Sequence, residues 1–114
     1  MAVTIELLKG IGVMPADSWP FDQPRNCATL TLRTIVFGGE PILRVSHDED
    51  DHSWQFLDGR APKTANAAVV TLSEIVDLDP SVIEVADLPP GWIAVRATKT
   101  SAWKRVPRDE SNQG

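Results

Sequence analysis

Residues 42–57 read Ile-Leu-Arg-Val-Ser-His-Asp-Glu-Asp-Asp-His-Ser-Trp-Gln-Phe-Leu, and Asp58-Gly59 follows directly. Branched and aromatic residues, which suit a pleated and half-buried surface, flank a wholly polar centre. Trp54 and Phe56 alternate with Gln55, so the two aromatic side chains are expected in the core and Gln55 on the opposite face. The stretch therefore predicts a β-hairpin, followed by a turn at Asp58-Gly59.

The polar centre of this hairpin runs from His47 to His52 and contains the carboxylates of Asp48, Glu49, Asp50 and Asp51. Carboxylates at this density cannot be buried without partners, so the whole tip is expected in water. Such a tip suits a cationic surface on another protein, because opposite charge speeds the encounter and selects the partner. The four acids are therefore the candidate binding residues.

The tip also holds the only two histidines of the chain. His47, His52 and Asp50 offer nitrogen and oxygen ligands of the kind that zinc takes, so a metal-dependent hydrolase is the alternative function. The spacing matches neither a HExxH motif nor a calcium-binding loop, and there is no cysteine pair. On these patterns we assign no metal ligand, no cofactor and no catalytic residue.

The chain has 114 residues, 42% of them hydrophobic and 24% charged, which is ordinary for a soluble globular protein. A single domain is expected over residues 1–107, with a disordered tail at 108–114. The net charge of -5 argues against general affinity for nucleic acid or anionic membranes. No apolar run has the length of a membrane span, no signal-peptide pattern is present, and Cys27 has no cysteine partner, so the cytoplasm is the expected compartment.

Alternation predicts further strands at residues 2–8, 27–36 and 92–97. In the second of these, Ala28, Leu30 and Leu32 are expected on one face, and Thr29, Thr31 and Arg33 on the other. Three prolines between residues 11 and 26 indicate a structured loop, pinned by Trp19 and Phe21.

Two short helices are predicted after the hairpin. Residues 67–70 are interpreted as an apolar lead into the first, which begins at the capping box Thr71-Leu-Ser-Glu74. Asp79 and Pro80 predict the cap and first residue of the second. The order of elements favours an α+β domain with a mainly antiparallel sheet and two short helices after the central hairpin.

The C-terminal region is locally basic, and its chain past Val106 is expected to fray. Trp92 and Trp103 lie among its cations, an arrangement seen where aromatic side chains stack on RNA bases. We favour a solvated strand edge whose charge offsets the acidic middle of the chain. The separation of charge also permits a homodimer. The cations are Arg96, Lys99, Lys104, Arg105 and Arg108.

Four segments resemble a bacterial domain family of unknown function, some related members of which are described as immunity proteins of polymorphic toxin systems. The segments are Ser46-His47-Asp48-x-Asp50, Trp54-Gln-Phe-Leu-Asp-Gly59, Leu78-Asp-Pro-Ser81 and Leu88-Pro-Pro-Gly-Trp92. The resemblance spans roughly Ala28 to Arg105. It implies a small non-enzymatic protein that binds and neutralises a toxin, and the acidic tip makes a toxin with a basic surface the expected partner.

Overall fold

The computed structural model describes residues 19–61 and 63–108. The predicted strand at residues 2–8, the first half of the predicted N-terminal loop (residues 11–18) and residues 109–114 lie outside this part of the chain. The described elements are β1 (Ala28–Leu32), α2 (Arg33–Val36), β2 (Arg44–His47), β3 (Trp54–Leu57), the 3-10 helix η2 (Thr64–Asn66), β4 (Ala67–Thr71), α3 (Leu72–Leu78), the 3-10 helix η3 (Pro80–Val85), β5 (Trp92–Val95) and β6 (Lys104–Pro107).

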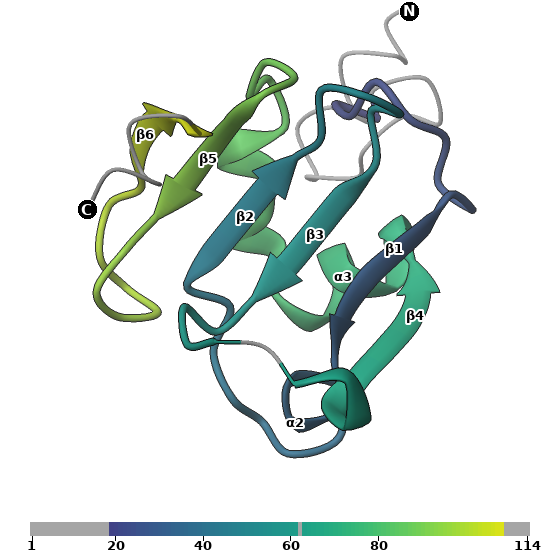
Figure 1. The fold of residues 1–114 in the computed structure, drawn as a ribbon, viewed down its shortest axis with the longest axis vertical. Coiled ribbons are helices and arrows are strands. Elements are labelled where there is room, and N and C mark those ends of the chain that lie inside the picture. Colours follow the sequence, from purple (N-terminus) through teal and green to yellow (C-terminus); the bar gives the residue numbers. More distant parts are fainter. Residues whose placement is uncertain (1–18, 62, 109–114) are drawn as a thin grey trace, which may run out of the picture.

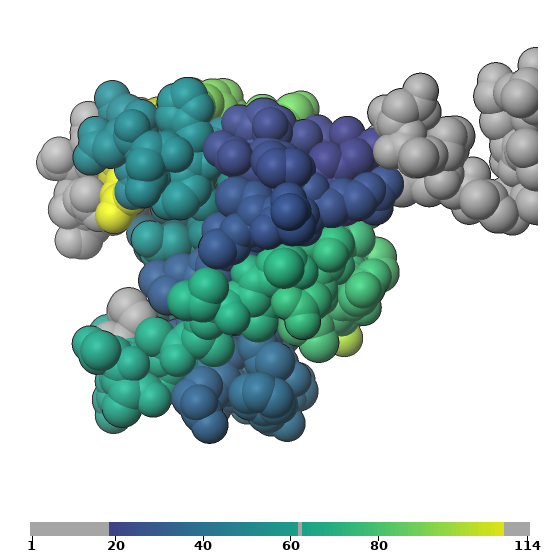
Figure 2. Space-filling model, turned by 90° about the vertical axis from the view of Figure 1, so that its right-hand side faces the viewer, coloured from purple at the N-terminus to yellow at the C-terminus, as the bar shows by residue number. Residues whose placement is uncertain are grey.

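The strands form one six-stranded sheet in the order β4-β1-β3-β2-β5-β6. β1 and β3 are parallel, and the other four described pairings are antiparallel, so the sheet is mixed. In Figure 1 the sheet faces the viewer, with α3 and η3 behind it. Figure 2 views the molecule from the edge, where β1 in blue lies beside the green segment of β4 and α3. The predicted α+β class is confirmed.

The hydrophobic core lies between the sheet and the helices behind it. Trp54 and Phe56 are fully buried there, as expected, and β2 contributes the fully buried Val45. The capping box is confirmed: Glu74 N donates to Thr71 Oγ1 at 3.2 Å, and Thr71 N donates to Glu74 Oε1 at 2.8 Å. The core side chains from α3 and η3 are Leu72, Ile75, Val82 and Val85.

The prediction of one continuous strand over residues 27–36 is wrong. β1 ends at Leu32, and a short helix, α2, follows it. The predicted alternation holds along β1, but the threonine face is the more buried one: Thr29 and Thr31 are buried, and Leu30 is only half-buried. Both hydroxyls are satisfied by the sheet itself: Thr31 Oγ1 donates to Phe56 O at 2.7 Å, and Thr29 Oγ1 donates to Val70 O at 2.9 Å.

Two further strands occupy segments that we interpreted otherwise. The apolar lead into the helix is the edge strand β4, paired with β1 over its whole length. Residues 104–107 form β6, which ends one residue past Val106, where fraying was expected to begin; Pro107 pairs with Trp92 of β5, and residues 109–114 lie outside the described chain. In residues 19–61 and 63–108, no helix has the length and apolar character that crossing a membrane requires.

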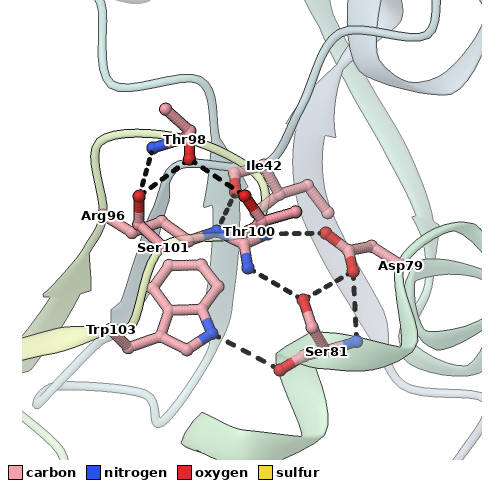
Figure 3. A network of polar contacts seen from close by, with 8 residues as sticks. All are labelled: Ile42, Asp79, Ser81, Arg96, Thr98, Thr100, Ser101 and Trp103. Carbon is pink, nitrogen blue, oxygen red and sulfur yellow. Dashed lines mark hydrogen bonds and ion pairs between the residues drawn. The ribbon is translucent and has the colours of Figure 1, made fainter.

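A buried ion pair joins the end of β5 to the start of η3 (Figure 3). Arg96 Nη2 lies 2.7 Å from Asp79 Oδ2, Nη1 donates to Ser81 Oγ at 2.9 Å, and Nε donates to Ile42 O at 3.0 Å. The guanidinium lies 4.0 Å from the centroid of the Trp103 ring. The interpretation of Arg96 as a solvated cation is therefore wrong.

Candidate functional site

The four candidate acids lie in the loop that joins β2 to β3, and three hydrogen bonds shape this loop. Asp48 N donates to Ser53 O at 2.8 Å and closes it. Asp50 N donates to Asp48 Oδ1 at 2.8 Å, and Ser53 N donates to Asp51 Oδ1 at 3.0 Å. Aspartate side chains commonly hold turns in this way, by accepting from the backbone two residues ahead. Two of the four carboxylates thus order the loop that presents them all.

The tip concentrates uncompensated negative charge. Glu49, Asp50 and Asp51 are exposed, and Asp48 is half-buried. Among residues 19–61 and 63–108, none of these four side chains makes an ion pair. The pKa of Asp51 is lowered, chiefly by hydrogen bonding to the Ser53 side chain and then to its backbone, so this carboxylate stays ionised at neutral pH.

We expect the amide resonance of Ser53 to titrate below the ordinary aspartate range. Because the pKa of Asp51 is lowered in the folded protein, its bond to Ser53 stabilises the loop at neutral pH and is lost as pH falls through that lowered pKa. A pH titration followed by NMR measures this midpoint. Asp51→Ala should abolish the step, and a midpoint at or above the ordinary range would contradict the assignment.

The prediction that the whole tip lies in water is wrong for His47. Its side chain is only 2% exposed, and its ring stacks on Trp54 with centroids 3.9 Å apart. Alternation along β2 places His47 on the core face together with Val45. Its Nδ1 lies 2.6 Å from Leu88 O, so Nδ1 carries a proton and donates. Its Nε2 lies 3.3 Å from Asp22 Oδ2, without the alignment of a hydrogen bond.

The candidate zinc ligands are not brought together. The Nδ1 of His47 is committed to Leu88 O. In the part of the chain that the structure describes, no three His, Cys, Asp or Glu side chains are grouped so as to hold a metal ion.

A second polar cluster was not singled out in the sequence. Arg44, Ser46 and Gln55 lie on the open face of the sheet, the face that α3 and η3 do not cover, and line a pocket of about 350 Å³. Ser46 and Gln55 are directly opposite each other, and Arg44 shares their face two residues earlier on β2. The sequence signal was their alternation with core residues on two adjacent strands.

Comparison of the chain with protein-family models, with curated proteins and with solved structures gave no match. The resemblance to the immunity-protein family therefore stays a prediction.

Proposed function

We propose that this protein is a non-enzymatic binding module whose acidic tip, Asp48 to Asp51, docks on a cationic surface of a protein partner. The observation that carries the proposal is the set of four carboxylates, ordered by the loop's own hydrogen bonds, with no cation paired to them among the described residues. Like charges held close together repel, and a cationic partner relieves that repulsion. Complementary charge also speeds encounter and selects the partner.

The contacts at the base of the tip support this proposal because they hold the loop in place before a partner binds. The tip extends from β2 and β3, the two middle strands of the sheet. A neighbouring turn buttresses it: Gly91 N donates to His47 O at 2.7 Å, and Glu49 lies against Gly91. A Cβ added at Gly91 would lie 3.1 Å from Glu49 Oε1, and its φ of +86° also favours glycine. Preordered binding loops lose less conformational entropy on association.

The partner we propose is a toxin with a basic surface, bound and blocked in the cytoplasm of a bacterial cell. This step rests on the resemblance of residues 28–105 to the immunity-protein family and on the charge of the tip. A toxin that acts on nucleic acid has the required cations, because it must bind phosphates.

Neutralising Glu49 and Asp50 is expected to slow association about tenfold and to flatten its salt dependence, since both effects come from long-range charge. The variant Glu49→Gln/Asp50→Asn spares the two carboxylates that order the loop. Its matched control is Glu84→Gln/Asp77→Asn, which removes the same two charges from exposed positions on η3 and α3.

The experiment is affinity capture from the native host, followed by association kinetics with the captured protein over a range of salt concentrations. The wild type and the control variant should both retain the partner, and their association rates should depend on salt in the same way. The tip variant should associate more slowly at low salt. Equal rates for the tip variant and the control at every salt concentration would refute the role of the tip.

A further inference from the structure

The open face of the sheet carries a pocket that is separate from the acidic tip. Arg44, Ser46 and Gln55 line it, and they belong to β2 and β3 at the middle of the sheet. Its volume of about 350 Å³ is within the range of small-molecule sites. The backbones of central strands are held by pairing on both sides, so the Cβ positions of these three residues are fixed before any ligand arrives.

The three polar side chains on β2 and β3 that line this pocket have no partner among the described residues. Ser46 is 3% exposed, yet its hydroxyl makes no hydrogen bond with any residue of the described chain. The Gln55 amide and the Arg44 guanidinium likewise make neither a hydrogen bond nor an ion pair there. Among the described residues, His47 Nε2 is the one fully buried polar side-chain atom without a hydrogen-bond partner, so the Ser46 hydroxyl still reaches water through the pocket. A nearly buried hydroxyl beside an unpaired guanidinium and an unpaired amide gives a ligand three polar groups to bind.

The charge of these groups selects an anion. A guanidinium fork binds a carboxylate or phosphate through two parallel N–H bonds, and the Ser46 hydroxyl and Gln55 amide add donors for the same oxygens. Arg60, at the rim, is bonded to Asp58 Oδ2 at 2.9 Å and to Glu40 Oε1 at 3.1 Å. Arg108 lines the pocket as well. The two carboxylates bonded to Arg60 lower the positive potential at that rim, so a singly charged carboxylate suits the site better than a doubly charged phosphate.

An apolar pocket adjoins the first. It has a volume of about 310 Å³ and shares Gln55 and Leu57 with the polar pocket. Leu30, Leu32 and Ala67 supply apolar lining from β1 and β4. A ligand that spans both pockets has an anionic end and an apolar end.

We propose that the open face binds a small amphiphilic carboxylate. Arg44, Ser46 and Gln55 hold the carboxylate, and the apolar end lies over Leu57 and Leu30. This site is independent of the binding function proposed for the tip, and its test does not require the toxin partner.

The test is an NMR titration of the full chain with butanoate, hexanoate and octanoate, beside octanol and octyl phosphate. We expect saturable shifts at the backbone amides of Arg44, Ser46, Gln55 and Leu30, with affinity rising roughly threefold per added methylene as the chain enters the apolar pocket. Octanol and octyl phosphate should bind more weakly than octanoate.

Three variants locate the carboxylate. Arg44→Gln is expected to weaken octanoate binding roughly tenfold to a hundredfold, the usual cost of a lost hydrogen bond to a charged group. Ser46→Ala should weaken it less. Arg33→Gln removes an exposed arginine that lines neither pocket, and it should leave binding unchanged. Thermal unfolding of each variant verifies that it is folded.

Several outcomes would overturn the proposal. The site is refuted if octanoate shifts no open-face resonance, or if it binds the Arg44→Gln variant as tightly as the wild type. Octanol binding as tightly as octanoate removes the role of the charge. Octyl phosphate binding more tightly than octanoate removes the assignment to carboxylates.

Discussion

Replacing Arg96 by methionine is expected to lower the free energy of unfolding by about 3–5 kcal/mol, the cost of removing one partner of a buried ion pair. The Asp79 side chain is 8% exposed and would remain charged and buried without its cation. Ser81 Oγ and Ile42 O would each lose a donor. Because small domains have only about 5–15 kcal/mol of stability, this is a large share of the total.

Denaturation in urea measures the change, with Arg33→Met as the control. Arg33 is exposed on α2, and its replacement should change stability by no more than about 0.5 kcal/mol. The double variant Arg96→Met/Asp79→Ser removes both charges and keeps a capping side chain at the start of η3. It should recover much of the loss, since no buried charge is left unpaired. If Arg96→Met costs no more than the control, the ion pair contributes nothing to stability.

The parts of this fold that were predictable are encoded within a few residues. The capping box needs only Thr71 and Glu74, and the start of η3 needs only Asp79 and Pro80. The burial of Trp54 and Phe56 follows from alternation within one strand. These signals act locally, so they are visible in the chain before any tertiary contact is known.

The parts that were missed depend on residues far apart in the chain. His47 is buried because Leu88, 41 residues later, supplies the acceptor for its Nδ1. Residues 67–70 are a strand because β1 supplies their hydrogen bonds, although their apolar character alone fits a helix equally well. No pattern along the sequence distinguishes such cases, because tertiary pairing overrides local preference.

The sequence predicts one of the two candidate sites and not the other, for the same reason. Exposure of the acidic tip follows from its composition, so Glu49, Asp50 and Asp51 were expected where they lie. Ser46 and Gln55 face each other only because of the register between β2 and β3. In the sequence they are polar residues at alternate positions, which is the pattern of an ordinary solvated face.

Replacing Trp54 by alanine is expected to lower the free energy of unfolding by about 3–5 kcal/mol, because a large cavity opens where the surrounding side chains cannot all collapse. Trp54 is fully buried and stacks on His47. The Phe21 ring packs edge to face against the Trp54 ring, with centroids 5.0 Å apart. Trp54 Nε1 donates to Asp22 Oδ1 at 3.2 Å. The indole thus holds the segment that precedes β1 against the hairpin.

Trp54→Phe separates these contributions. Phenylalanine keeps most of the ring contacts and loses the bond to Asp22, whose side chain is 47% exposed and can turn to water. Trp54→Phe should therefore lower the free energy of unfolding much less than Trp54→Ala does. Hydrogen exchange adds a local test, with Trp103→Ala as the control. This control makes the same tryptophan-to-alanine change beside β6, at the edge of the sheet, where Trp103 packs against Arg96. Trp54→Ala should raise the exchange rates of the Phe21 and Asp22 amides more than the control does. Equal exchange in the two variants would show that the segment before β1 is held by other contacts.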